Sequence, residues 1–188
     1  MAHNLEGDLL VAGGLAPYAY QTRQGNTWSV ATATAFAAVV TKPLTVAPLE
    51  IVNNSGTQYM VINHIWSWML LGTAVTWAHT IWAQVGAAVY SANTALVFYD
   101  GMGGSYASAT ASKARTALTQ TVVENGWQAF PGSTMPQSLG AATPSGACVG
   151  QVEGKLVVPP GLAVHLAVSA SVTTASAFQC GANFTWTT

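Results

Sequence analysis

Charged side chains are scarce in this sequence. Of 188 residues, five are Lys or Arg and six are Asp or Glu, which is 6% of the chain, whereas about 25% is typical of soluble domains. The apolar fraction of 51% is only slightly high, so Ala, Thr, Ser, Gly, Asn and Gln take the place of the missing charges. Charged residues are depleted at the centres of protein interfaces. The composition therefore predicts a subunit largely covered in an assembly, with a secreted or membrane-associated protein rich in small residues as the alternative.

No segment has the charge pattern of a nucleic-acid-binding protein or the apolar length of a membrane span. The five basic residues are scattered along the chain: Arg23, Lys42, Lys113, Arg115 and Lys155. They form no basic stripe, so we expect no direct binding of nucleic acid. The sequence between Glu50 and Asp100 is uncharged, but polar residues interrupt it. No window of about 20 residues is continuously apolar, as a membrane-spanning helix requires, and we expect no membrane insertion.

Motifs that would carry chemistry are also missing. The sequence has no G-x-S-x-G motif for a nucleophile, and its few acidic residues are scattered. The four histidines lack H-x-H or H-x-x-x-H spacing, and no cysteine pair has the spacing of a zinc site. We therefore predict that the protein is not an enzyme and binds no metal or cofactor. Cys148 and Cys180 permit one disulfide, but Cys180 falls on an apolar strand face, and we expect both thiols to be buried and reduced.

The clearest structural signal lies in residues 156–186. Residues 162–172 read LAVHLAVSASV, and residues 178–186 read FQCGANFTW. In both runs apolar residues recur with a period of two, which places them on one face of a strand. The sequence Pro159-Pro160-Gly161 turns the chain into the first run, because proline lacks the N–H that a strand ladder needs. These runs predict two antiparallel strands joined by a short turn.

Similar strand signals recur through the rest of the sequence after residue 48. We count about eight strands, with turn residues at the spacing typical of a sandwich or barrel, and no alternation of strands with helices. The predicted fold is all-β: an antiparallel, jelly-roll-like β-sandwich over residues 48–188. Residues 1–47 are broken by glycine and proline into pieces too short for a core of their own, and they predict an extended N-terminal arm.

Three groups of residues are candidates for contacts with other molecules. The arm carries apolar side chains that would be poorly placed in free solution, and we predict that they lie across a neighbouring molecule: Leu9, Leu10, Val11, Tyr18, Tyr20 and Trp28. Residues 58–71 are apolar on both faces, which is typical of a strand covered twice, and we assign one face to a subunit interface: Met60, Ile62, His64, Trp66 and Trp68. Trp127 lies in a loop rich in Pro and Gly and is the candidate for an exposed stacking platform.

A low-charge β domain rich in Thr, Ala and Ser resembles the jelly-roll decoration (cement) proteins of tailed-bacteriophage heads. The sequence VVPPG at residues 157–161, which leads into a strand of alternating Leu and Val, is similar to the same family. Trimeric tumour-necrosis-factor-like and fibre-tip domains share similar strand beginnings. The resemblance implies a homotrimer on the virion exterior, made in the host cytoplasm, that binds the major capsid protein and reinforces contacts between capsomers. It also implies that the six apolar residues of the arm contact the capsid lattice. It implies no catalytic residues. The alternative is a trimeric receptor- or glycan-binding module, such as a fibre tip or a lectin-like domain.

Overall fold

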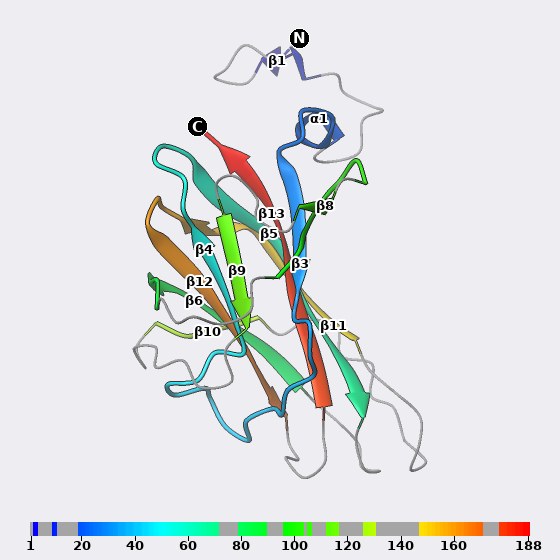
Figure 1. Ribbon diagram of the computed structural model, residues 1–188, viewed down its shortest axis with the longest axis vertical. Coiled ribbons are helices and arrows are strands. Elements are labelled where there is room, and N and C mark those ends of the chain that lie inside the picture. The colour runs from blue at the N-terminus through cyan, green and yellow to red at the C-terminus, as the bar shows by residue number, and fades with distance from the viewer. Residues whose placement is uncertain are drawn as a thin grey trace.

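Two antiparallel β-sheets pack face to face in the part of the chain that the structure describes (Figure 1). The computed structural model describes residues 2–3, 9–10, 19–71, 79–89, 96–103, 105–106, 112–116, 126–130, 147–170 and 177–188. The predicted all-β sandwich is therefore confirmed. The helix among these residues, α1 (Ala19–Arg23), is short, and no described helix is long and apolar enough to cross a membrane.

One sheet has five strands and the other has six. In spatial order, the five-stranded sheet contains β10 (Gln128–Phe130), β6 (His79–Ala87), β12 (Leu162–Ala170), β4 (Leu49–Asn53) and β9 (Ser112–Thr116). The six-stranded sheet contains β11 (Ala147–Val158), β5 (Tyr59–Leu71), β13 (Ala177–Thr187), β3 (Thr27–Ala31), β7 (Phe98–Asp100) and β8 (Ser105–Tyr106). Two short strands, β1 (Ala2–His3) and β2 (Leu9–Leu10), pair with each other.

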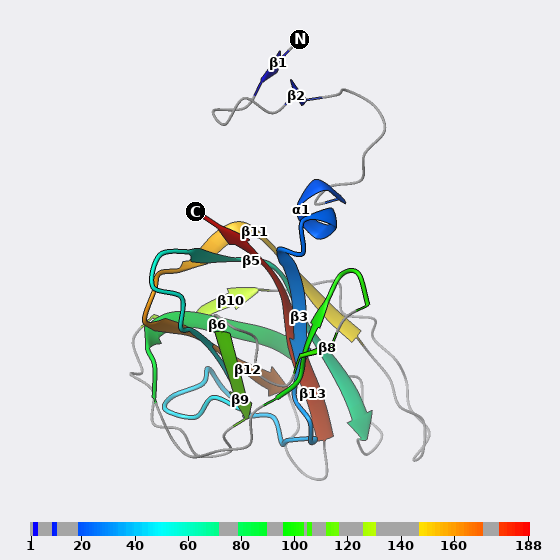
Figure 2. The same ribbon diagram turned by 45° about the horizontal axis from the view of Figure 1, so that its top comes forward.

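The strand order is that of a jelly roll. Without the additional strands β7, β8 and β9, eight strands remain, and the first of these, β3, pairs with the last, β13. The second, β4, pairs with the seventh, β12. The third and sixth, β5 and β11, pair with each other, as do the fourth and fifth, β6 and β10. Figure 2 shows β3 and β13 side by side, as in Figure 1. Two Greek keys wrapped in this way give the double-sheet jelly roll.

The two strands predicted in residues 156–186 are present at the centre of one sheet each: β12 pairs with β6 and β4, and β13 pairs with β5 and β3. They lie in different sheets and do not pair with each other, and the turn predicted between them falls outside the described residues. Val164, Leu166 and Val168 of β12 point into the space between the sheets and are buried, and Phe178 and Phe184 of β13 meet them from the other side. The turn between β11 and β12 is made by Pro159, Pro160 and Gly161, and Gly161 has a φ of 79° that favours glycine. Each fully buried Leu or Phe contributes roughly 1.5–3 kcal/mol to folding.

The long strand β5 contains a β-bulge that the sequence pattern did not predict. Ile62 pairs with Phe184 and His64 pairs with Asn183, so that Asn63 is an extra residue without a partner across the strand. The Asn63 amide donates a hydrogen bond to Thr185 Oγ1 at 2.6 Å. Because an extra residue moves every following side chain to the opposite face, the predicted shared face of residues 60 to 68 is wrong.

Met60 and Ile62 are fully buried between the sheets, and their assignment to a subunit interface is therefore wrong. His64 and Trp66 follow the bulge and are half-buried on the outside of the sheet, and Trp68 is exposed there. The predicted interface thus keeps three of its five residues on an outer surface.

The sandwich begins well before residue 48. Strand β3 is hydrogen-bonded between β13 and β7, and Phe36 and Val39 form bridges to Phe178 and Ser169 in the two different sheets. The chain therefore crosses from one sheet to the other between residues 36 and 39. Ala47 is also fully buried. Residues 27–47 are part of the sandwich, and the predicted boundary at residue 47 is not where the sandwich starts.

Both cysteines lie on the inner side of the six-stranded sheet. Cys148 of β11 and Cys180 of β13 each pair with Ser67 of β5, which lies between them. Two strand spacings separate the cysteines by roughly 10 Å, whereas the Cα atoms of a disulfide lie about 4.4–6.8 Å apart. Both are buried and not bridged, and burial raises the pKa of the Cys180 thiol. The prediction of buried, reduced thiols is confirmed.

Candidate assembly surface

The outer side of the six-stranded sheet carries large apolar side chains in solvent. We use the name outer sheet face for this surface, which is marked by Tyr59, Trp66 and Trp68 of β5, Val149 and Val157 of β11, and Tyr99 of β7. Trp68 is 52% exposed and Tyr99 is 54% exposed. Single exposed apolar residues are ordinary, but several on one surface mark a site of interaction.

Strand register sets these side chains in rows across the sheet. One row is apolar, with Val149, Trp66 and Gly181 from three adjacent strands. A Cβ atom on Gly181 would lie 2.5 Å from Cζ2 of Trp66, which is far inside van der Waals contact. The Trp66 ring therefore lies across the backbone of β13 at the one place where no side chain rises from it.

The neighbouring row is polar and uncharged apart from a histidine. It runs from Gln151 of β11 through His64 and Asn183 to Ser29 of β3 and then to Tyr99 of β7. Hydroxyl and carboxamide groups in this row are available for hydrogen bonds with a partner, and the aromatic rings at its edges supply contact area. Apolar groups with interspersed uncharged polar groups are typical of a specific protein interface.

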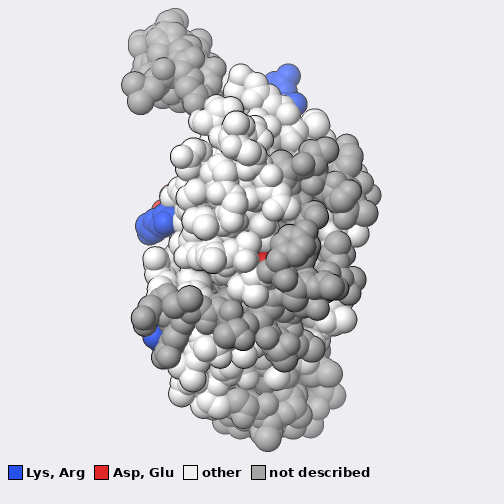
Figure 3. All heavy atoms as spheres, turned by 60° about the vertical axis from the view of Figure 1, so that its left-hand side comes forward, with Lys and Arg blue, Asp and Glu red and all other residues white. Residues whose placement is uncertain are grey.

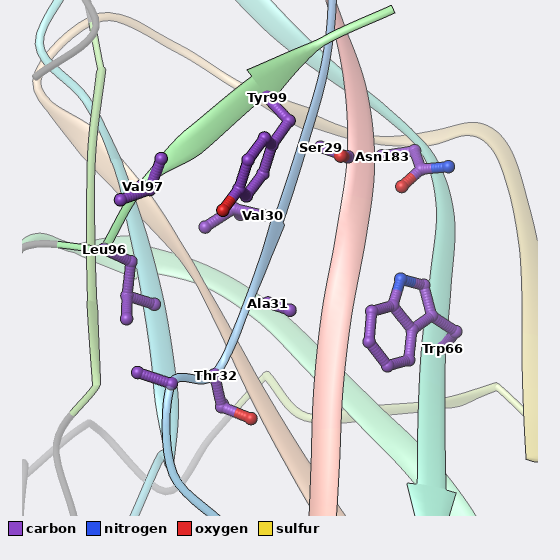
Figure 4. A pocket seen from close by; sticks show the side chains of 10 residues that line it. Ser29, Val30, Ala31, Thr32, Trp66, Leu96, Val97, Tyr99 and Asn183 are labelled. Atoms are coloured by element: carbon purple, nitrogen blue, oxygen red, sulfur yellow. The ribbon is translucent and has the colours of Figure 1, made fainter. Parts of the chain in front are cut away.

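A shallow groove of about 310 Å³ lies in this surface between Trp66 and Tyr99. Figure 4 shows the two rings on either side of β3 and β13, with Ser29, Ala31 and Asn183 between them. No charged residue lines this aromatic groove. Its dimensions and lining fit one apolar or aromatic side chain from another molecule.

Charged side chains on this sheet are confined to its ends and edge. Glu153 and Lys155 lie in an exposed irregular segment of β11, where the register shifts between Gln151 and Leu156, and Glu153 has a φ of 49°. Asp100 lies at the end of β7. Figure 3 shows one face of the molecule, on which charged side chains of the described residues occur in only a few places. The scarcity of charge in the sequence is therefore visible on the surface.

The outer side of the five-stranded sheet is different, because the chain itself covers its centre. Ala167 of β12 is buried against Ala47 and Trp127. Trp127 donates a hydrogen bond from Nε1 to the Leu44 carbonyl oxygen at 3.1 Å and is only 8% exposed. The candidate role of Trp127 as an exposed stacking platform is therefore wrong, since the segment around Leu44 covers its ring.

A buried ionisable pair lies under the same cover. His165 Nε2 is 3.0 Å from Glu50 Oε2, and the Val89 backbone N–H donates to the same oxygen at 3.1 Å. Both side chains are almost completely buried. Glu50 Oε1 and His165 Nδ1 have no hydrogen-bond partner among the described residues. The pair joins β4 to β12 and holds the segment at Val89 against the sheet, which is a structural role.

The predicted arm contacts have mixed outcomes. Val11 and Tyr18 lie outside the described residues, and Leu9 and Leu10 form β2, whose side chains are not described. Tyr20 of α1 is 49% exposed. Trp28 of β3 packs partly buried against the core, so its assignment to an extended arm is wrong.

Four residues of the outer sheet face were not predicted from the sequence: Tyr59, Tyr99, Val149 and Val157. Exposed and buried residues alternate along β11: Val149, Gln151 and Val157 are exposed, whereas Cys148, Val152 and Val158 are buried. This alternation could have predicted that Val149 and Val157 lie on the surface. Tyr99 gave no such signal, because β7 has only three residues.

Neither the described side chains nor comparison with known proteins assigns a chemistry to this surface. Among the described side chains, no group of three His, Cys, Asp or Glu residues is placed to hold a metal ion. No protein-family model, no curated protein and no solved structure matches the chain.

Proposed function

We propose that the protein is a virion structural subunit: a head decoration (cement) protein that forms a homotrimer, binds the outer capsid lattice and stabilises contacts between capsomers. The observation that carries the proposal is the outer sheet face, where exposed aromatic and apolar side chains lie beside uncharged polar groups. The resemblance of the sequence to jelly-roll decoration proteins supplies the class of assembly.

The outer sheet face is suited to contact between subunits. Trp and Tyr are the residue types that most often dominate binding energy, and truncation of such an anchor costs about 2 kcal/mol or more. Trp68 and Tyr99 are anchors of this kind, and the aromatic groove beside Trp66 is a receptor for a neighbour's side chain. A stable contact of standard size buries about 1,600 Å² in total.

The proposed trimer would stabilise the capsid mechanically. Each trimer adds apolar contact and hydrogen bonds across neighbouring copies of the major capsid protein, which raises the free energy needed to separate them under the pressure of the packaged genome. Because many trimers act on one shell, weak individual contacts sum to a large effect. The segment before α1, with Leu9, Leu10, Val11 and Tyr18, is the proposed contact with the capsid.

The proposal can be tested by looking for the chain in purified virus particles. Particles purified on a density gradient should contain the chain on the capsid exterior, where added protease reaches it. A variant that lacks residues 1–18 should still fold, because the described sandwich starts at β3, but it should no longer sediment with capsids.

The full chain is the control in the same sedimentation experiment. Absence of the chain from purified particles would refute the proposal. Equal attachment of the shortened and full chains would show that the N-terminal segment is not the contact with the capsid.

A further inference from the structure

A second groove lies at the end of the sandwich where α1 meets β13. It measures about 370 Å³, and its lining includes Tyr20, Gln21, Gln24, Asn26, Gln58 and Trp186. We use the name amide groove for this site, because four of these six residues have carboxamide side chains. None of the lining residues is Lys, Arg, Asp, Glu or His.

Hydrogen bonds fix the backbone that presents these carboxamides. The Asn26 backbone N–H donates to the Gln21 carbonyl oxygen at 3.0 Å, and the Asn26 carbonyl accepts from the Trp186 N–H at 3.0 Å. On the opposite wall, the backbone carbonyl oxygen of Gln58 accepts a hydrogen bond from the side-chain amide of Asn53 at 2.8 Å. The backbone N–H of Gln58 donates to Ser55 Oγ at 2.8 Å. The groove is therefore built on positioned segments from both sides.

Much of the hydrogen-bonding capacity of the groove is unused by the described residues. The Asn26 amide donates to Gln21 Oε1 at 3.1 Å and contacts Gln24 Oε1 at 3.5 Å. These contacts leave the NH₂ groups of both glutamines without a partner among the described residues, and the Gln58 carboxamide makes no hydrogen bond among them. Each carboxamide offers two donors and an acceptor. A ligand that meets them must both donate and accept at closely spaced positions.

The remaining feature is an aromatic ring in solvent. Tyr20 is 49% exposed at the edge of the groove, and an aromatic face offers apolar contact together with a negative π-surface that attracts polarised C–H groups. A pyranose ring has this combination of properties, with an apolar face of C–H groups and a rim of hydroxyls that donate and accept. No lining side chain is charged, so the side chains offer no ion pair to an anionic or cationic ligand.

We propose that the amide groove binds a neutral carbohydrate, with one pyranose stacked on Tyr20 and its hydroxyls hydrogen-bonded to Gln21, Gln24 and Gln58. The groove adjoins the outer sheet face at Tyr59, which pairs with Thr187 of the groove lining, but it contains none of the residues that define that face. The inference therefore goes beyond the proposed structural role and does not depend on it. On a virion surface such a site would give contact with glycans.

Saturation-transfer NMR on the full chain tests the site, with glucose, galactose, mannose and N-acetylglucosamine as probes, followed by an array of neutral and acidic oligosaccharides. At least one neutral sugar should receive saturation, with its axial C–H face closest to the protein. Tyr20→Ala and Gln58→Leu should each weaken binding by about tenfold, the loss expected for one stacking or hydrogen-bonding contact. Val40→Ala, at an exposed residue outside the groove, should bind as the parent does.

Two results would overturn the proposal. One is the absence of any signal with all four sugars and the array, and the other is unchanged binding in both groove variants, which would place the sugar elsewhere. Thermal melts of each variant establish that it is folded. The oligomeric state is measured on the same samples, so that a failure of carbohydrate binding and a failure of the proposed assembly are separate observations.

Discussion

Substitution of Gly181 by alanine should destabilise the protein because the Trp66 ring and the next strand occupy the position of the new methyl group. The Cβ atom would lie 2.5 Å from Cζ2 of Trp66 and 2.6 Å from the Val30 carbonyl oxygen, whereas non-bonded heavy atoms prefer about 3.5–4.0 Å. The indole can swing away, but the Val30 oxygen belongs to the backbone of β3. The β13–β3 ladder must therefore widen locally.

Overpacking of this kind costs about 1–3 kcal/mol in free energy of unfolding. For a chain of this length, each kcal/mol lowers Tm by about 2–4 °C, so Gly181→Ala should melt about 2–12 °C lower. Urea unfolding followed by tryptophan fluorescence measures the same loss. All variants must be compared at one protein concentration, because the stability of an oligomer depends on it.

Gly56→Ala is the matched control. Nothing lies within 4 Å of the Cβ position at Gly56, and we expect its free energy of unfolding to stay within about 0.5 kcal/mol of the parent. If Gly181→Ala were as stable as Gly56→Ala, the Trp66 ring would not lie across β13, and the apolar row that Trp66 forms on the outer sheet face would not exist.

Three further predictions concern buried ionisable groups. Glu50→Ala should lower the free energy of unfolding by about 3–5 kcal/mol, because it leaves His165 buried without its partner; a loss below about 1 kcal/mol in urea would contradict the structural role of the pair. Burial lowers the pKa of His79 below its ordinary 6.5, so the unfolded chain binds a proton first as the pH falls. The free energy of unfolding should therefore decrease below about pH 6.5, and a His79→Phe variant with an equally steep decrease would refute this cause. Iodoacetamide should modify Cys148 and Cys180 only after unfolding, and mass spectrometry that finds either labelled in the native protein would contradict their burial.

The sequence predicted the parts of the fold that follow a simple period. Residues 162–172 and 178–186 alternate apolar and other residues. The structure places β12 over Leu162–Ala170 and β13 over Ala177–Thr187, with the predicted sides inward. The period of two is a direct consequence of strand geometry, so it is readable without tertiary information.

Features set by tertiary contacts were not readable. The bulge at Asn63 changes which side of β5 is buried, and the Asn63 side chain donates its hydrogen bond to Thr185, 122 positions later in the sequence. Trp127 was predicted to be exposed because its surroundings are rich in Pro and Gly, but the segment near Leu44 covers it. In both cases the deciding partner is distant in the sequence, and local patterns carry no information about it.

The predicted boundary between the arm and the sandwich was wrong for a related reason. Strand β3 has only five residues and gives little periodic signal, yet it completes the jelly roll by pairing with the last strand. Such a pairing joins the two ends of the sandwich and is invisible to any window of the sequence.

Sedimentation velocity of the full chain at micromolar concentration tests the central claim most directly, namely that the outer sheet face is covered by other subunits. The chain should sediment as a trimer, and so should Val40→Lys, which places a charge at an exposed apolar residue outside that face. Trp68→Lys, which places a charge at an exposed aromatic residue of the outer sheet face, should sediment as a monomer that keeps its β-rich circular dichroism. A monomeric parent chain, or a Trp68→Lys variant that remains trimeric, would contradict the account.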